Sequence, residues 1–371
     1  MDINIIQKKL DYYKKFLPIN FESEKKKFYT TLAQRRTYSP IFKYRDVTSL
    51  KQYQFIHDQL RNSHDQDPVI SRFIELYQKI ALLLIAWKKA DYQKLTVISG
   101  SIFGSYEKLN LKKTINQYNK IKKLLQQEKS LYSSKQLAKK ILAILKENGI
   151  KNWSIEYSSS HGTEVSIYEL EKKIIIKPNH YFSEIELNRI ICHEIRGHAF
   201  QTFNALKNRK YSILFTNYLG TELNYEGLAI FTEISELPSI YIIRIINRYL
   251  LFMIAIKTAS ESSFYHTYKV VYNLCKDQEF SFMAVYRAKR GFKNTSEKGT
   301  LQIDNSYLFG ALQILRLIKK DKNNYLKIIQ GSFPLSAIQY INPQREKWVA
   351  VKQLNHKNIN LFCKTLEPIL D

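Results

Sequence analysis

The sequence contains little cysteine. Only three cysteines occur in 371 residues, at Cys192, Cys275 and Cys363. They are too few and too scattered for a disulfide framework, and no two are spaced as a thiolate clamp for a metal ion. We therefore expect a chain that works in a reducing compartment, which favours the cytoplasm.

Long apolar runs are also missing. The two most apolar windows, at 80–87 and 249–256, are far shorter than the roughly 20 residues that span a bilayer. The first residues, MDINIIQKKLDYYKKF, carry charges throughout and lack the apolar core and cleavage site of a signal peptide. We expect no transmembrane segment and no export by the general secretory route.

No internal repeat and no linker rich in proline, glycine or serine divides the chain. The apolar share of 44% in 371 residues is enough to bury a large core. We expect a helical N-terminal region at 1–145 and a second region at 146–371, which are either two tightly coupled regions or one domain.

Positive charge is abundant. The chain has 58 Lys and Arg against 33 Asp and Glu, a formal net charge of +25. A field of this sign attracts nucleic acid, anionic membranes and acidic polypeptides. Lysine is, however, abundant together with asparagine, isoleucine and tyrosine, so a general drift in composition explains the charge equally well.

The first region has helical periodicity. Apolar residues recur at spacings of three and four in 69–87 and in 134–150, where Gly149 is placed to end a helix. The stretch YSPIFKYRD at 38–46 contains Pro40 and predicts an extended loop between helices.

The period then changes to two. The segments WSIEYS, TEVSIYEL and KKIIIKPN between 153 and 179 predict a small antiparallel meander with turns at SSHG and at Glu-Lys pairs, and the last strand offers an edge for an extended peptide. A helix follows at once, because Ser183 and Glu186 form a capping box and Phe182 can pack on Leu187.

More helices are expected at about 221–235, 239–257, 263–275 and 306–320. The predicted fold is therefore α+β and mostly α-helical, with a small antiparallel sheet before the helix that carries the motif HEIRGH at 193–198. An N-terminal helical region completes it.

The motif HEIRGH contains residue types that bind metal ions. Two imidazoles on one helix face can bind zinc, and Glu194, beside His193, can take a proton from a water molecule. The usual spacing is four residues, whereas His193 and His198 are five apart and would diverge on a regular α-helix. A π-type turn repairs this spacing, and Gly197 suits both such a distortion and the close approach of a neighbouring element.

A zinc site needs a third protein ligand. Glu222, Glu226 and Glu233 are four and seven residues apart, so all three lie along one face of the predicted helix at 221–235. Any of the three can turn inward to a metal ion. The alternative is a chance pair of helical histidines, since the chain has eight.

Five elements, in order, resemble those of the microtubule-associated tyrosine carboxypeptidases and their bacterial relatives, the flavohaemoglobin-expression-modulating QEGLA-motif proteins. HEIRGH followed by Asn204 resembles the family's HEIGTH with a later Asn, and YEGLA at 225–229 resembles QEGLA. The family's PxFxY, RxxRG and KDxxYLxG elements resemble PIFKY at 40–44, RAKRG at 287–291 and IDNSYLFG at 303–310. The resemblance spans roughly residues 35–320.

The resemblance implies a zincin-like, zinc-dependent carboxypeptidase, with 146–371 as its catalytic region. His193, His198 and Glu226 would bind Zn²⁺, and Glu194 would be the general base. The eukaryotic members remove the C-terminal tyrosine of α-tubulin. Departures at Arg196, Tyr225 and Ile303 leave these residues intact and bear more on substrate choice than on chemistry.

A carboxypeptidase must bind a free carboxylate, for which the planar guanidinium is best suited. Arg287 and Arg290 are the candidates, and structural pairing with Asp304 is the alternative for both. Tyr307, or a histidine outside the motif, is a candidate donor to the oxyanion of the tetrahedral intermediate.

The expected partners are acidic polypeptide C-terminal tails, tubulin-like, and the substrate loses one tyrosine-like residue. The competing hypotheses are a basic nucleic-acid or membrane-surface binding protein with a vestigial metal site, and a regulatory protein without peptidase activity. No RNA-binding motif with interleaved basic and aromatic residues supports the nucleic-acid hypothesis.

Overall fold

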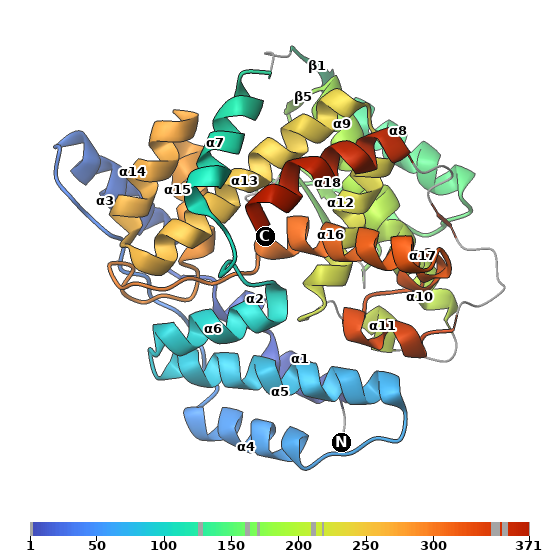
Figure 1. The fold of residues 1–371 in the computed structure, drawn as a ribbon, viewed down its shortest axis with the longest axis horizontal. Coiled ribbons are helices and arrows are strands. Elements are labelled where there is room, and N and C mark those ends of the chain that lie inside the picture. The colour runs from blue at the N-terminus through green and yellow to red at the C-terminus, as the bar shows by residue number, and fades with distance from the viewer. Residues whose placement is uncertain are drawn as a thin grey trace. The chain divides into compact units, whose positions relative to one another are not determined.

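Helices dominate the chain, and the strands are few and short (Figure 1). The computed structural model describes residues 3–124, 129–159, 164–168, 171–208, 213–216, 219–342, 349–350 and 355–370. By contacts, the chain forms two compact units. The first comprises Met1–Lys122, Asn247–Phe309 and Thr365–Asp371, and the second comprises Lys123–Ile246 and Gly310–Lys364.

The first unit is built from helices. Those that lie wholly within it are α1 (Ile3–Leu10), α2 (Tyr12–Lys15), α3 (Phe21–Ala33), α4 (Leu50–Arg61), α5 (Pro68–Lys88), α6 (Tyr92–Phe103), α7 (Leu111–Lys122), α14 (Phe264–Cys275) and α15 (Gln278–Ala288). The predicted loop at 38–46 is confirmed, since it lies between α3 and α4. The segments on both sides of this loop are helical, as predicted.

The second unit contains all the described strands. Its elements are β1 (Ser130–Ser133), α8 (Ser134–Glu147), β2 (Ser154–Tyr157), β3 (Val165–Tyr168), β4 (Lys173–Ile176), β5 (Tyr181–Ser183), α9 (Glu184–Ile190), the π-helix η1 (Ile191–Ala199), α10 (Phe200–Lys207), α11 (Ile213–Thr216), α12 (Glu222–Glu236), α17 (Asn323–Ile328) and the 3₁₀ helix η2 (Leu335–Tyr340). Three further helices are divided between the units, namely α13 (Ser239–Glu261), α16 (Asn305–Lys320) and α18 (His356–Leu370).

The α+β, mostly helical fold is confirmed. The division into a helical region at 1–145 and a catalytic region at 146–371, which are either tightly coupled or one domain, stays a prediction.

The sheets form from the three predicted β-segments and two further short strands. In the larger sheet β4 is central, antiparallel to β3 and parallel to β2. In the smaller one β1 and β5 pair antiparallel and lie side by side in Figure 1. The predicted turns, at SSHG and before β4, fall largely at 160–163 and 169–170, outside the described residues.

Two β predictions are wrong. The three β-segments do not form an antiparallel meander, because β2 pairs with β4 in parallel and the strand order is β2-β4-β3. The segment KKIIIKPN does not offer an edge, because both sides of β4 are hydrogen-bonded to other strands. The run of isoleucines in this segment indicates a central strand. Ile174 and Ile176 are fully buried, as is typical of such a strand.

A hydrophobic core fixes one side of the helix that carries HEIRGH. Ile191, Ile195 and Ala199 recur every four residues on η1 and pack in one cluster with residues of α8, β4 and α9. The capping box of Ser183 and Glu186 is confirmed and defines where the helix begins. The other side of η1 is therefore left to face α12.

Helix α13 is 23 residues long and apolar enough to cross a membrane, while 61% of its apolar window is buried inside the structure. A core helix of a soluble protein has the same length and composition, so this helix is weak evidence for a membrane span.

Candidate metal centre

The helix η1 has π geometry over Ile191–Ala199 and runs directly into α10. This confirms the π-type turn predicted from the five-residue spacing of the histidines. The wider helix brings the two side chains to one side, and the ring centroids of His193 and His198 lie 4.8 Å apart with their planes nearly perpendicular.

Gly197 allows α12 to approach this helix closely. A Cβ atom added to Gly197 would lie 2.8 Å from the Cα atom of Ala229 and 2.9 Å from its Cβ atom. These distances are shorter than real side-chain contacts, so only glycine fits here. The prediction that Gly197 permits close packing is confirmed, and it places the glutamates of α12 within reach of the histidines.

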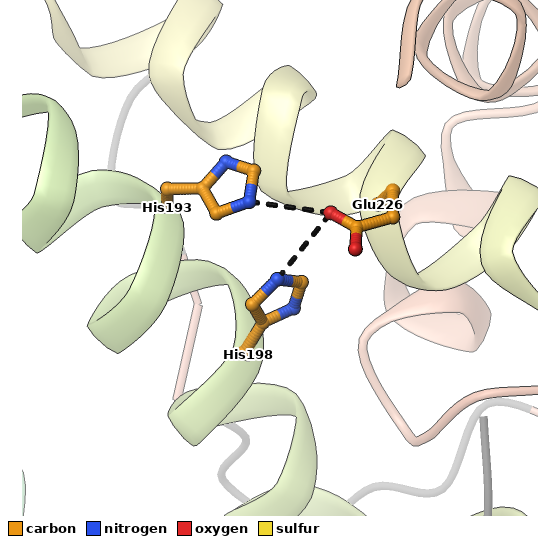
Figure 2. A group of neighbouring side chains, drawn as sticks. All are labelled: His193, His198 and Glu226. Atoms are coloured by element: carbon orange, nitrogen blue, oxygen red, sulfur yellow. Dashed lines mark ion pairs between the residues drawn. The ribbon is translucent and has the colours of Figure 1, made fainter. Parts of the chain in front are cut away.

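Three side chains converge from these two helices (Figure 2). The Nε2 atoms of His193 and His198 lie 3.2 Å and 3.6 Å from the same oxygen, Oε2 of Glu226. The three potential ligand atoms all lie within 4.8 Å of one another. Both histidines are buried, and the Glu226 side chain is 16% exposed.

The oxygen at the meeting point fits a cation better than a hydrogen-bonded cluster. Among the residues that the structure describes, Oε2 of Glu226 is buried and has no partner with hydrogen-bond geometry. Its ion pairs with the two histidines leave this oxygen without a well-directed hydrogen bond, and a metal ion held by all three side chains would satisfy it. The site can therefore hold a metal ion with two imidazole ligands and one carboxylate ligand.

The three side chains are coupled by charge. Burial disfavours a charged imidazole, but the contacts of His193 with Glu226 and Glu233 outweigh it and raise the pKa of His193 to about 10, so a metal ion must displace a proton from this ring in order to bind. Burial likewise disfavours the carboxylate of Glu226, yet its contacts with the two histidines hold its pKa well below the usual range. The carboxylate thus stays anionic, which a metal ligand requires.

Glu233 supports His193 from its other ring nitrogen. Oε1 of Glu233 lies 2.6 Å from Nδ1 of His193, and Glu233 is fully buried. The sequence placed Glu233 among three possible ligands, whereas the structure puts its carboxylate behind the histidine. Its position could have been inferred from the sequence, because a residue seven positions after Glu226 lies on the same helix face, two turns further along.

Glu194 lies on η1 and is half-buried. It is not one of the three converging residues. It follows His193 directly in the chain, and its role of general base stays a prediction.

The remaining predicted site residues lie in the first unit. Nε of Arg287 donates to Oδ2 of Asp304 at 2.8 Å, and its NH2 group contacts Oδ1 of Asp304 and the hydroxyl of Tyr307. The pairing of Arg287 with Asp304 is the alternative that the sequence left open. Nε of Arg290 is buried and has no hydrogen-bond partner in the described part of the chain.

Two helices of a mostly helical α+β fold thus bring together two imidazoles and a carboxylate that could hold a metal ion, and a second carboxylate, that of Glu194, is adjacent to His193 in sequence. The sequence model of the microtubule-associated tyrosine carboxypeptidase family matches residues 27–352. The chain belongs to this family, and the predicted resemblance is confirmed. No curated protein sequence matches the chain.

Proposed function

We propose that this chain is a zinc-dependent carboxypeptidase that removes one C-terminal residue, tyrosine-like, from acidic polypeptide tails such as those of tubulin. The observation that carries the proposal is the convergence of His193, His198 and Glu226 in a member of a carboxypeptidase family. We propose the cytoplasm as its location, since the family is described as microtubule-associated.

Zinc is the metal that this donor set fits best. Two imidazoles and one carboxylate are a ligand set of catalytic zinc sites, in which the fourth position stays open. When bound, zinc would polarise the scissile carbonyl and make water more acidic. The ligand roles would belong to His193, His198 and Glu226, whose donor atoms lie within 4.8 Å of one another.

Glu194 is the proposed general base. It follows a ligand directly in sequence, and its side chain is only half-buried, so water can reach it. Its carboxylate would take a proton from the attacking water and deliver it to the leaving amine. This shuttle explains why a free carboxylate is needed beside the ligands.

Arg287 and Arg290, the predicted residues for recognition of the free C-terminus, receive different roles. The two guanidinium groups differ in their availability, since Arg287 already makes a two-point contact with Asp304. The buried, unpartnered Nε of Arg290 among the described residues supports a direct contact of Arg290 with the substrate carboxylate. Arg287 would orient Tyr307, the proposed oxyanion donor, through the contact of 3.3 Å between its NH2 group and the Tyr307 hydroxyl.

The basic composition supports an acidic substrate. A net charge of +25 would speed the encounter with a negatively charged tail, at a rate that falls as salt is added. Charge alone does not select tyrosine at the end of the tail, so this part of the proposal depends on the family.

The test uses a set of acidic and neutral peptides, each with a free or an amidated C-terminus, incubated with the wild type or with Glu194→Gln. Mass spectrometry should show loss of a single terminal residue, only from free carboxylates and only with the wild type. Tyrosine-ended acidic peptides should react fastest. Internal cleavage, or equal trimming of amidated peptides, would contradict the carboxypeptidase assignment.

The net charge also motivates a second candidate, a nucleic-acid or membrane-surface binding protein with a vestigial metal site. Salt-sensitive binding to RNA or to anionic vesicles, retained by Glu194→Gln and accompanied by no peptidase activity in the wild type, would favour it.

A further inference from the structure

The two histidines of the metal centre are held in different ways. His193 contacts Glu233 through its Nδ1 atom at 2.6 Å, so this carboxylate fixes the orientation of the ring. Nδ1 of His198 is buried and, within the described part of the chain, has no hydrogen-bond partner. A metal-binding imidazole almost always has a partner at its second nitrogen, so His198 needs another means of support.

The ring of Tyr225 supplies such support. It stacks on the imidazole of His198 with a centroid separation of 3.7 Å and an angle of 8° between the planes. Tyr225 is 7% exposed and His198 is 4% exposed, so both rings are enclosed by protein. The stacked ring of Tyr225 lies against one face of the imidazole and so hinders its rotation about the side-chain bonds. In this respect the stacking has the same effect as a hydrogen bond to the ring.

The position of Tyr225 in the chain strengthens this interpretation. Tyr225 immediately precedes Glu226 on α12, so one turn of helix carries both a ligand and the ring that restrains another ligand. The close packing of η1 on α12, at Gly197 and Ala229, fixes the distance between the two rings.

We propose that Tyr225 is a positioning residue that holds the imidazole of His198 in its metal-binding orientation by ring stacking, in the role that Glu233 has for His193. This inference rests on the proposed function, because it assumes a metal ion at this centre. Its distinctive requirement is an aromatic ring at position 225, not a hydroxyl group.

The first test measures zinc affinity by competition with a chromophoric chelator. Tyr225→Leu should bind zinc about tenfold more weakly than the wild type, as is usual when support for a ligand is removed. Tyr225→Phe keeps the ring and should retain the wild-type affinity. If Tyr225→Leu destabilises the metal-free protein, Tyr225→Met replaces it. Its side chain is also apolar and lacks a ring, but it is longer and unbranched, and its zinc affinity is compared with that of Tyr225→Phe in the same way.

The second test needs no metal. In the metal-free protein, stacking on Tyr225 should shift the ring-proton resonances of His198 upfield, and the spectrum of His198→Asn identifies them. The shift should persist in Tyr225→Phe and disappear in Tyr225→Leu. A merely structural role for Tyr225 would change thermal stability without this pattern.

Three outcomes would overturn the inference. Equal zinc affinity of Tyr225→Leu and the wild type would remove the positioning role while leaving the metal centre intact. Equal weakening in Tyr225→Phe and Tyr225→Leu would show that the hydroxyl acts instead of the ring. A wild type that binds no zinc would overturn the proposed metal centre itself, and this inference with it.

Discussion

Nδ1 of His193 lies 2.6 Å from Oε1 of Glu233, and both side chains are buried. The carboxylate therefore directs Nε2 of the same ring toward Glu226, 3.2 Å away. Glu233→Gln keeps the shape but loses the charge, and we expect zinc affinity to fall about 10- to 100-fold. Titration with a competing chelator measures this change. Unchanged affinity would remove Glu233 from the support of the site.

Metal content gives a direct check of the ligands. The purified wild type should contain about one zinc ion per chain, and His193→Ala should contain almost none, because the remaining imidazole and carboxylate hold zinc weakly. His266→Ala is the matched control, since His266 is exposed and lies in the first unit. Elemental analysis of the three proteins decides the matter, and equal zinc in all three would rule out the site.

Gly197→Ala tests the contact between η1 and α12. The new Cβ atom would meet Ala229 at 2.8 Å, so the helices must separate, at a cost of about 1–3 kcal/mol. We expect a lower unfolding midpoint in urea and weaker zinc binding, since Glu226 moves with α12. Adding Ala229→Gly should restore only part of the loss, because the nearest atom is the backbone Cα.

The two arginines of RAKRG should respond differently to substitution. Arg290→Met is expected to raise KM for peptides with a free C-terminus about tenfold, through loss of a charged hydrogen bond, with little change in stability. Arg287→Met leaves Asp304 buried without its partner and should lower stability by about 3 kcal/mol. Steady-state kinetics and urea unfolding of both variants separate these roles. Equal effects of the two variants on KM would contradict the assignment.

The lowered pKa of Asp46 makes the free energy of unfolding depend on pH. Its side chain is 2% exposed and contacts Lys15, Lys88 and Tyr53. Burial opposes its charge, but these contacts and a backbone hydrogen bond lower the pKa of Asp46 from 3.8 to about 2. The resulting stabilisation, about 2 kcal/mol, is fully present above pH 4 or so and is lost as the pH falls through about 2.

Asp46→Asn should therefore be about 2 kcal/mol less stable than the wild type at pH 7, with a gap that narrows as the pH falls from about 4 to 2. Urea unfolding over this range measures it. Asp58→Asn is the control, because the Asp58 side chain is 67% exposed and should contribute little. A gap that does not depend on pH would mean that the charge of Asp46 is not the cause.

Much of the fold could be predicted because its signals are local. The capping box of Ser183 and Glu186 involves residues three apart, and the helix at α12 was evident from its periodicity. The parallel pairing of β2 with β4 could not be predicted, since it depends on which segments meet in space. The same limitation made the free edge at β4 a wrong prediction.

The sequence by itself determined the candidate metal ligands and the local distortion that they need. His193 and His198 are five residues apart, and only a wider helix turns both to one side, so η1 follows from spacing and backbone geometry. Helix periodicity alone left three glutamates of α12 open, the resemblance implied Glu226, and the tertiary structure placed that residue against the histidines. Glu222, Glu226 and Glu233 share a helical face, and the depth to which Gly197 lets α12 approach puts Glu226 at both imidazoles and Glu233 behind one of them.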